Sequence, residues 1–170
     1  MVHDPPFQTQ QCRLRQASGE DLIMEPLRQR DAEYLANSVA AIEPWRTLHR
    51  GAADLLVYLT EVDPHSHRWV ALRNRQHVGI VGIRSPWLYG PYIALLAVLP
   101  GNQRQGIGSG ILGWIEAEVR RTAKNIWVCA SSFNQPARAF YVRNGFSQVG
   151  ILEDLTMEDQ SECLLRKRLT

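Results

Sequence analysis

The order of hydrophobic and polar positions along the chain predicts strands and helices in an irregular succession. Short apolar runs between turn residues are typical of strands, and apolar positions that recur every three or four residues are typical of helices. The pattern predicts strands over residues 21–27, 68–74, 77–85, 92–99, 125–131, 146–154 and 162–169. It predicts helices over residues 30–42, 52–62, 106–123 and 135–145.

This order is neither a meander nor a regular strand–helix–strand repeat. We therefore expect an α/β (α+β) fold, with a mixed, twisted central sheet of about seven strands flanked on both faces by about four helices. Residues 1–20 are polar and contain Pro5, Pro6 and Gly19, so we expect a loosely ordered N-terminal leader there. Residues 21–170 are expected to form a single domain, because this length suffices to bury a core.

The composition is that of an ordinary globular protein, with 45% hydrophobic and 21% charged residues. A net charge of +2 is too small for a surface built to bind nucleic acid, so no nucleic-acid partner is expected. Cys12, Cys129 and Cys163 are odd in number and far apart, which favours a reducing compartment. No apolar run approaches the ~18 residues of a membrane helix, and the first residues do not resemble a signal peptide. We expect a cytoplasmic protein without a membrane partner.

Candidate chemistry begins in a glycine-rich loop within AVLPGNQRQGIGSGIL, residues 97–112. The loop lies where the strand over 92–99 gives way to the helix over 106–123. The first turn of a helix leaves backbone N–H groups without partners, and the helix dipole adds positive potential there. Glycines let an anion approach that backbone closely, so the loop suits a phosphate group.

The spacing of the loop excludes two common phosphate-binding motifs. A P-loop requires a lysine after its last glycine, whereas Ser109 and Gly110 follow Gly108 here. The dinucleotide fingerprint requires a glycine at position 111, which is Ile111. From the loop alone, a glycine-rich connection without a ligand remains the alternative.

The stretch Gln-Arg-Gln-Gly-Ile-Gly at 103–108 resembles the pyrophosphate-binding loop of the GNAT superfamily of N-acetyltransferases. A second stretch, NQPARAFYVRNGF at 134–146, resembles the segment of that family in which Asn, Pro and Ala precede an aromatic pair and a Gly-Phe. The order of predicted elements over 21–169 is also similar to the GNAT fold. By this resemblance the chain is identified as a bacterial-type member of the superfamily, and its sheet is expected to open as a V between the fourth and fifth predicted strands.

The resemblance implies an acetyl-CoA-dependent N-acetyltransferase, in which a primary amine attacks the thioester directly within a ternary complex. It implies that backbone groups at 96–98 pair with the pantetheine arm, and that residues 103–109 surround the pyrophosphate. The contacts with acetyl-CoA that it assigns are Leu96, Ala97, Val98, Gln103, Arg104, Gln105, Gly106, Ile107, Gly108, Ser109, Asn134, Ala137 and Tyr141. Leu96 and Val98 are equally compatible with a core strand, and Asn134 with a helix cap.

The resemblance makes Tyr141 the acid that protonates the departing CoA thiolate. The ordinary pKa of a phenol, near 10, permits donation to a thiolate whose acid has a pKa near 8.5. The backbone N–H of Val98 would stabilise the oxyanion, at a strand irregularity expected there. The alternative for Tyr141 is a core tyrosine that packs beside Phe140.

No residue stands out as the general base. Many members of the family carry a glutamate on the strand before the pyrophosphate loop, but residues 92–96 contain no carboxylate. Glu43, near the turn between the first two helices, is one candidate, and Asp154 or Glu153, at the end of the sixth strand, is the other. For each of them, a solvated surface charge is the alternative.

Four aromatic residues come from segments that the fold would bring to the acceptor cleft. They favour an acceptor with an apolar part, with core packing as the alternative, and the two tyrosines among them would shape the cleft or relay protons. These residues are Trp45, Trp87, Tyr89 and Tyr92.

Other polar features predict no further chemistry. His65 and His67 have no third ligand nearby, so no metal is expected. Cys129 lies in an apolar strand and is interpreted as a small buried hydrophobe. The terminal strand carries a basic run at 166–168 and is expected at a solvated sheet edge, where a homodimer would form.

Two other functions stay open from the sequence. The missing strand carboxylate is compatible with a non-catalytic acyl-CoA-binding sensor or regulatory module, against which Tyr141 argues. A toxin-type acetyltransferase of aminoacyl-tRNA would need a basic surface, which the net charge does not indicate. The preferred acceptor is a small-molecule or peptide amine.

Overall fold

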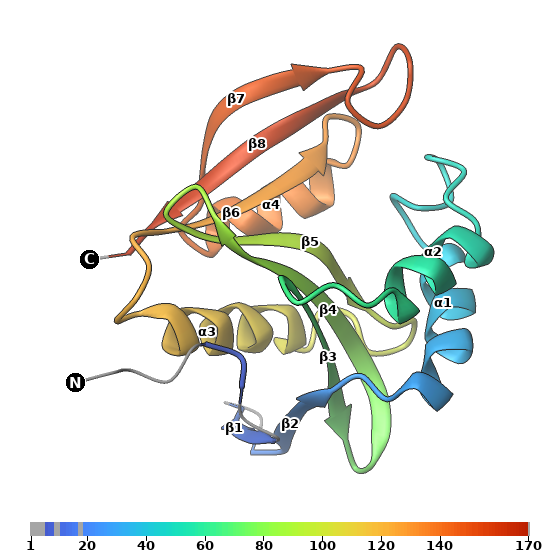
Figure 1. Cartoon of the computed structure of the whole chain (residues 1–170), viewed down its shortest axis with the longest axis vertical. Coiled ribbons are helices and arrows are strands. Elements are labelled where there is room, and N and C mark those ends of the chain that lie inside the picture. Colours follow the sequence, from blue (N-terminus) through green and yellow to red (C-terminus); the bar gives the residue numbers. More distant parts are fainter. Residues whose placement is uncertain (1–5, 9–10, 17–18, 170) are drawn as a thin grey trace.

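The computed structural model describes residues 6–8, 11–16 and 19–169, and within them the chain forms eight strands and four α-helices (Figure 1). The strands are β1 (Cys12–Arg15), β2 (Asp21–Pro26), β3 (Ser66–Arg73), β4 (Gln76–Trp87), β5 (Gly90–Val98), β6 (Asn125–Ser131), β7 (Ser147–Glu153) and β8 (Ser161–Arg168). The helices are α1 (Ala32–Ala40), α2 (Ala52–Thr60), α3 (Ile107–Val119) and α4 (Gln135–Arg143). None of the helices described is long and apolar enough to cross a membrane.

Every predicted strand and helix is present, and the expected mixed sheet with flanking helices is confirmed. Helix α4 starts and stops at its sequence signals, with Pro136 in its first turn and Gly145 just past its end at a φ of 86°. Helix α3 is shorter than predicted. It ends at Val119, whose carbonyl accepts hydrogen bonds from the N–H groups of Thr122 and Ala123.

The expectation of a loose leader over residues 1–20 is wrong for the part of it that the structure describes. Strand β1 pairs antiparallel with β2 along its whole length. Phe7 is 4% exposed, packs against Trp114 of α3 and donates its backbone N–H to Glu118 at 3.0 Å. These partners lie about a hundred residues away in sequence, so local composition did not reveal that the segment is packed.

The eight strands form one sheet in the order β1-β2-β3-β4-β5-β6-β8-β7. Strand β8 thus lies between β6 and β7, and the expectation of a terminal strand at a solvated edge is wrong. Its basic run has partners on both faces: Lys167 pairs with Glu116 of α3, and Arg166 lies over the ring of Trp127 at 5.7 Å. A homodimer stays a prediction.

The sheet separates two hydrophobic cores, with α1 and α2 on one face and α3 on the other (Figure 1). Neighbouring strand residues point to opposite faces. Val70 and Ile80 pack toward α1 and α2, whereas Ala71 and Val81 pack toward α3. Alternate residues of β6 join the α3 core together with Tyr141 of α4; these are Ile126, Val128 and Ala130.

Strand β5 changes face at Ala94 and then leaves β6. The register with β4 shifts between Ile93 and Leu95, so Ala94 has no partner and forms a bulge. As a result, Ile93 faces the α3 core and Leu95 faces α1 and α2. The parallel pairing with β6 involves only Tyr92 and Ile93, and beyond it the two strands diverge (Figure 1). This divergence is the V expected between the fourth and fifth predicted strands.

Candidate active site

Helix α3 begins directly after the glycine-rich loop, and its first turn has no capping side chain. The N-cap residue is Gly106, and the first helical bond runs from the Gly110 N–H to the Gly106 carbonyl at 2.9 Å. The N–H groups of Ile107, Gly108 and Ser109 therefore lack helical acceptors. Its first turn also contains no acidic residue to complement the positive end of the helix dipole. This end of α3 suits an anion, as the sequence predicts.

Two glycines of the loop are required for different reasons. Gly106 has a φ of 78°, a left-handed backbone that residues with a Cβ adopt only at a cost. Gly108 lies within the helix, but a Cβ on it would approach the ring of Phe140 in α4 to 2.9 Å. The sequence interpretation assigned both glycines to the approach of an anion, whereas Gly108 is needed for the packing of α4 against α3.

Hydrogen bonds to β3, to β5 and within the loop hold the loop in shape. The buried Arg73 of β3 donates from Nη1 to Oε1 of Gln105 at 2.6 Å. Gln105 in turn donates from Nε2 to the carbonyl of Gly101 at 3.0 Å, and Gln103 donates from Nε2 to the carbonyl of Val98 at 3.3 Å. The side chains of both glutamines therefore stabilise the conformation of the loop itself.

A groove of about 1050 Å³ runs over this end of α3 and along α4. All the predicted contacts with acetyl-CoA line it except Gln105, whose side chain is bonded to Arg73 and Gly101. Residues of β5, the glycine-rich loop and α4 form its walls. The predicted cofactor residues, which are spread over some forty-five positions of sequence, are brought together in one groove.

Strand β5 presents free backbone groups to this groove. The N–H of Leu99 donates to the carbonyl of Val78 at 2.9 Å, so alternation along the antiparallel pair also directs the polar groups of Ala97 toward β4. The N–H and C=O groups of Leu96 and Val98 consequently point the other way, into the V. Both polar groups of Leu96 and the N–H of Val98 are therefore available for the predicted backbone contacts, whereas those of Ala97 are not and the Val98 carbonyl accepts from Gln103.

A second cavity, of about 290 Å³, opens toward the α1–α2 face of the sheet. Residues 43–50, α2, and the diverging ends of β5, β6 and β8 line it. Six residues line both this cavity and the groove: Glu43, Trp45, Leu96, Asn134, Ala137 and Tyr141. The groove and the cavity therefore meet at the V.

Tyr141 lies at this junction. Its side chain is 6% exposed, and its ring packs edge-on against Phe140 and Phe146. The hydroxyl makes no hydrogen bond within the described residues, yet it is not sealed off from the two spaces that it borders. Burial raises the pKa of Tyr141 above the ordinary value, so the phenol keeps its proton at physiological pH. Tyr141 is thus a core tyrosine whose hydroxyl faces the site.

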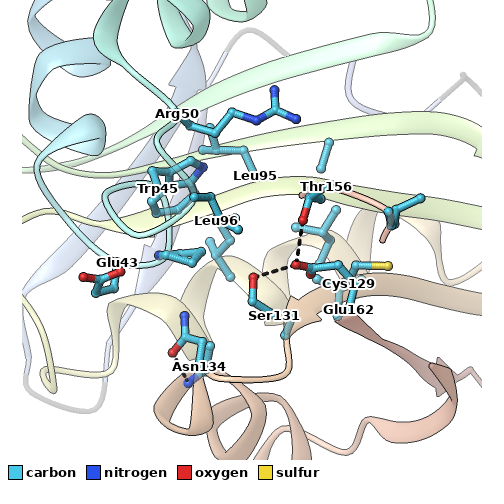
Figure 2. Close-up of a pocket in the computed structure, with 18 of the residues that line it drawn as sticks. Glu43, Trp45, Arg50, Leu95, Leu96, Cys129, Ser131, Asn134, Thr156 and Glu162 are labelled. Atoms are coloured by element: carbon cyan, nitrogen blue, oxygen red, sulfur yellow. Dashed lines mark hydrogen bonds between the residues drawn. The ribbon is translucent and has the colours of Figure 1, made fainter. Parts of the chain in front are cut away.

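Asn134 likewise fulfils the structural role foreseen for it and keeps a free polar group. Its Oδ1 accepts a hydrogen bond from the Ala137 N–H at 3.2 Å and caps α4. Its amide nitrogen makes no bond in the part of the chain that the structure describes and points into the cavity (Figure 2). Capping of α4 by Oδ1 therefore leaves the amide nitrogen of Asn134 as a hydrogen-bond donor at the junction.

Sequence reasoning missed a buried carboxylate in the smaller cavity. Glu162, near the start of β8, is 4% exposed. Ser131 of β6 donates to its Oε1 at 2.6 Å, and Thr156 donates to the same oxygen at 3.3 Å (Figure 2). The one sequence signal is alternation along β8, where Cys163 and Leu165 enter the α3 core and leave Glu162 on the other face. A lone charged residue near a strand end is ordinarily exposed, so this signal did not single it out.

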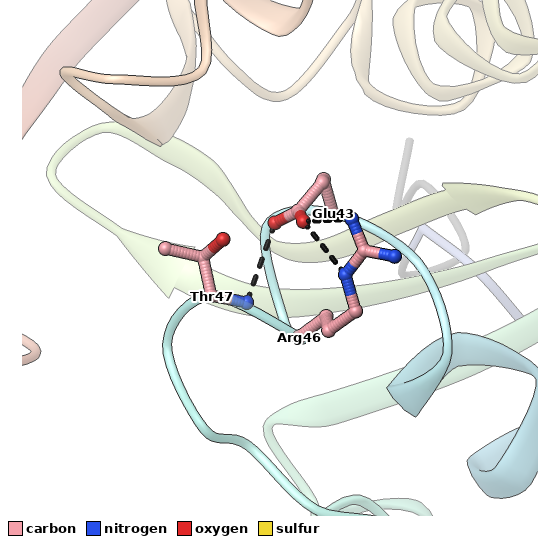
Figure 3. Close-up of polar contacts among 3 residues, drawn as sticks. All are labelled: Glu43, Arg46 and Thr47. Carbon is pink, nitrogen blue, oxygen red and sulfur yellow. Dashed lines mark hydrogen bonds and ion pairs between the residues drawn. The ribbon is translucent and has the colours of Figure 1, made fainter.

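Glu43 lines both spaces, but its carboxylate is already occupied. Oε1 accepts hydrogen bonds from Arg46 at 2.7 and 3.0 Å, and Oε2 accepts one from the Thr47 N–H at 3.3 Å (Figure 3). The hydrogen bonds from Thr47 and Arg46 hold the pKa of Glu43 below its ordinary value. A carboxylate stabilised in this way is a weak base, which argues against Glu43 as the general base.

Comparison with known proteins decides the family. Residues 26–146 match the profile of the Acetyltransferase (GNAT) family. The chain belongs to this family. It is 30% identical over 146 residues to the aminoalkylphosphonate N-acetyltransferase of Salmonella typhimurium, a match that covers 81% of this chain and 86% of the relative. The resemblance inferred from the sequence is confirmed, and the protein is an enzyme of the N-acetyltransferase type.

Solved structures agree on the GNAT fold. Mycobacterium smegmatis RimJ, solved in complex with CoA-disulfide, superposes with a TM-score of 0.73 at 16% identity, over 97% of this chain and 90% of that chain. The ribosomal-protein-S18-alanine N-acetyltransferase of Escherichia coli gives a TM-score of 0.69 at 19% identity, over 88% of this chain and 94% of that chain.

Two base candidates of this GNAT chain lie outside both spaces. Asp154 follows β7, and its Oδ1 accepts a hydrogen bond from the Asp159 N–H at 2.8 Å. Glu153 is exposed at the end of β7. Neither lines the groove or the cavity, although Leu155 and Thr156, which follow them in the chain, line the cavity. The placement argues against either residue as the base.

Of the four aromatic residues expected at the acceptor cleft, two reach it. Trp45 borders the groove and the cavity, and Tyr92 borders the cavity alone. Trp87 packs behind Tyr92, with ring centroids 5.0 Å apart, and lines neither space. Tyr89 is 83% exposed in the turn between β4 and β5, so it does not shape the cleft.

Cys129 lines the smaller cavity beside Tyr92 rather than filling a core. Burial raises the pKa of its thiol above the ordinary value. Little thiolate is therefore present at neutral pH, and the thiolate is the nucleophilic form. Cys129 therefore contributes an uncharged thiol to the lining of the cavity.

The histidine pair does not form part of a metal centre in the residues described. His67 packs against the ring of Phe7, with centroids 5.4 Å apart. No group of three His, Cys, Asp or Glu side chains that suits a metal ion occurs within residues 6–8, 11–16 and 19–169.

Proposed function

We propose that this protein is an acetyl-CoA-dependent N-acetyltransferase, which moves the acetyl group to a primary amine by direct attack in a ternary complex. The observation that carries the proposal is the junction at Tyr141, where a long groove meets a separate cavity on the opposite face of the sheet. Two substrates that enter from opposite faces would meet there. Membership of the GNAT family supports acetyl transfer as the reaction.

The polar groups of the groove fit acetyl-CoA. The uncapped first turn of α3 would hold the pyrophosphate, and the backbone groups of Leu96 and the N–H of Val98 would pair with the amides of the pantetheine arm. The free amide nitrogen of Asn134 would donate to the same arm. The three cysteines form no disulfide, which suits the cytoplasm as the expected compartment.

The oxyanion donor that we favour is the backbone N–H of Leu96. Leu96 borders both the groove and the cavity, whereas Val98 borders the groove alone. The strand irregularity expected at Val98 occurs at Ala94, two residues before Leu96. A free N–H beside the bulge and at the junction would meet the developing negative charge, and Val98 would contact the pantetheine arm instead.

Tyr141 would act as the acid. Its phenol stays protonated, and its hydroxyl is free of hydrogen bonds within the described residues. As the C–S bond of the thioester breaks, the phenol would give its proton to the thiolate, and the attacking nitrogen would return one as the amide forms. The raised pKa of Cys129 supports direct attack over an acyl-cysteine route.

The acceptor that we propose to test first is an aminoalkylphosphonate. The relative from Salmonella typhimurium is named for this substrate class. Arg50 lines the smaller cavity (Figure 2), and no ion pair within the described residues includes it. A guanidinium at the cavity would bind a phosphonate by charge-assisted hydrogen bonds.

Thiol release from acetyl-CoA tests the proposal, with 2-aminoethylphosphonate, ethanolamine, spermidine and a short peptide as acceptors. Calorimetry measures the binding of acetyl-CoA in parallel. Release with at least one amine is expected. Arg50→Gln should raise KM for 2-aminoethylphosphonate about tenfold and leave KM for ethanolamine unchanged, because only the first carries an anionic group.

The outcomes separate the candidate functions. Binding of acetyl-CoA without release from any amine would favour the non-catalytic acyl-CoA sensor. Absence of binding would refute the proposal. An equal KM for 2-aminoethylphosphonate in the wild type and in Arg50→Gln would exclude Arg50 as the phosphonate ligand.

A further inference from the structure

Glu162 is a buried carboxylate without a cation beside it. It is 4% exposed, and none of the ion pairs in the described part of the chain includes it. Removing an ionised carboxylate from water is unfavourable unless a cation and hydrogen bonds compensate for the lost hydration. The fold supplies the hydrogen bonds from Ser131 and Thr156 but leaves the charge unpaired.

The two oxygens of Glu162 have different surroundings. Oε1 accepts both hydrogen bonds, which fixes the orientation of the carboxylate (Figure 2). Oε2 accepts none within the described residues, yet it is not sealed off, and Glu162 is part of the lining of the smaller cavity. One oxygen is therefore used for positioning, and the other is available to a ligand in the cavity.

The groups that face Glu162 from β5 and β6 are neutral. Burial first, and the charge of Glu162 in addition, raise the pKa values of Tyr92 and Cys129, so both keep their protons. The charged groups that line the rest of the cavity come from the α1–α2 side: Glu43, which is paired with Arg46, and Arg50 and Asp54. Glu162 thus provides the buried negative charge on the β6–β8 side of the cavity.

We propose that Glu162 binds the ammonium group of the acceptor and accepts the proton that its nitrogen must lose before attack. The incoming R–NH₃⁺ supplies the cation that the fold lacks beside Oε2. This role rests on the proposed function, because it takes the smaller cavity as the acceptor site. Glu162 would thereby take the role of the strand glutamate that many family members carry and that β5 lacks.

The protons balance across the step. One N–H bond of the ammonium breaks, and its proton moves to Oε2. The nitrogen lone pair then forms the C–N bond to the acetyl carbon, the C–S bond breaks, and the thiolate takes the proton of Tyr141. The nitrogen returns a second proton to Tyr141, which leaves R–NH–acetyl and the free thiol. Glu162 finally releases its proton to water.

The test compares Glu162→Gln with the wild type and with Glu158→Gln. Glutamine keeps the shape of Glu162 and an oxygen that accepts from Ser131 and Thr156, but it removes the charge. Glu158 is an exposed carboxylate in the connection that leads from β7 into β8 and lines neither space, so it serves as the matched control. Thiol release, calorimetry and thermal melting are measured for all three proteins.

Glu162→Gln is expected to lower kcat/KM for the active amines by about 100-fold or more, as expected for loss of a general base. The dissociation constant of acetyl-CoA should stay within about twofold, because Glu162 does not line the groove. Without this base the variant depends on the neutral fraction of the amine, so its residual kcat/KM should rise more steeply with pH than that of the wild type. Its melting temperature should equal or exceed that of the wild type, since an unpaired buried charge is removed.

Three results would overturn the proposal. One is an unchanged kcat/KM in Glu162→Gln. Another is a rise in KM alone, with kcat and its pH profile preserved, which would exclude proton transfer to Glu162. The third is a lower melting temperature together with lost acetyl-CoA binding, which would make the residue structural.

Failure of the proposed function would look different. The wild type itself would then release no thiol with any amine of the panel. In that case, 2-aminoethylphosphonate is titrated calorimetrically into the wild type and into Glu162→Gln, both saturated with coenzyme A. Binding that is weakened at least tenfold in the variant supports ammonium recognition by Glu162, and equal or absent binding in both overturns it.

Discussion

Burial determines the protonation states at the residues around the junction. Tyr141 and Tyr92 both lie in the interior, and burial raises the pKa of each phenol above its ordinary value. The same effect keeps the thiol of Cys129 protonated. Glu43 is the opposite case, because hydrogen bonds lower its pKa and keep it ionised. Tyr141 therefore stays protonated throughout the physiological range, and the base that the proposed reaction needs would be another residue.

This protonation state predicts the alkaline side of the pH profile. A raised pKa means that Tyr141 loses its proton only above its ordinary value near 10. Below that pH the acid stays competent. For an acceptor whose ammonium form persists above pH 9.5, we expect kcat/KM to show no alkaline decline between pH 6 and 9.5, measured by thiol release. A decline with a midpoint below pH 9 would contradict a buried phenol as the acid.

A substitution at Cys129 tests whether the amine attacks the thioester directly. Because its thiol stays protonated in the cavity wall, Cys129→Ala is expected to keep kcat within about threefold of the wild type. Mass spectrometry of the wild type incubated with acetyl-CoA alone should find no acetylated cysteine. A stable acetyl adduct on Cys129, together with a loss of turnover in the alanine variant, would establish a two-step route instead.

At the scale of elements, the start of α3 and the bulge of β5 create the groove. The left-handed Gly106 leaves the first turn of α3 without a capping side chain, and its free N–H groups point out of the helix end. The bulge at Ala94 turns β5 while its pairing with β6 stops at Ile93. The free backbone groups of Leu96 and the free N–H of Val98 follow from that interruption. The uncapped start of α3 and the bulge of β5 both expose backbone N–H and C=O groups that would be hydrogen-bonded within a regular helix or sheet.

Gly106→Ala and Gly113→Ala form a matched pair on the same helix. Alanine at Gly106 must adopt a φ of 78°, so we expect a melting temperature lower by about 2–4 °C, and weaker acetyl-CoA binding as the loop shifts. Gly113 lies mid-helix, with nothing within 4 Å of an added Cβ, so alanine there should raise the melting temperature by a similar amount of about 2–4 °C and leave binding unchanged. Melting curves and calorimetry check both. Equal acetyl-CoA affinities in the two variants would contradict the role of Gly106.

The sequence predicted the elements well because each carries its own periodicity or end signal. Pro136 and Gly145 mark the ends of α4, for example, whatever its neighbours are. The bulge at Ala94 was not predictable, since residues 90–98 are almost uniformly apolar and show no alternation that a register shift would interrupt. Glu162 was missed for a related reason: its burial depends on Ser131 and Thr156, which the sheet order brings to it.

At the scale of the whole molecule, the site depends on the order of strands in the sheet. Because β8 inserts between β6 and β7, Glu162 lies at the V, while the predicted candidates Glu153, at the end of β7, and Asp154, just after it, line neither space. The split between β5 and β6 then lets a groove on the α3–α4 side meet a cavity on the α1–α2 side. No local pattern specifies this order, so the sequence predicted the anion-binding loop from its own residues but, of the four aromatic residues expected at the acceptor cleft, only Trp45 and Tyr92 line the cavity.

The most direct test of acid catalysis at this junction is the turnover number of Tyr141→Phe beside its affinity for acetyl-CoA. Phenylalanine keeps the packing on Phe140 and Phe146 and removes only a hydroxyl that makes no hydrogen bond within the described residues. We predict a fall in kcat of about 100-fold or more, with the dissociation constant of acetyl-CoA unchanged within about twofold. A variant that keeps its kcat within twofold of the wild type would show that the thiolate leaves without Tyr141, and the assignment of the acid would be wrong.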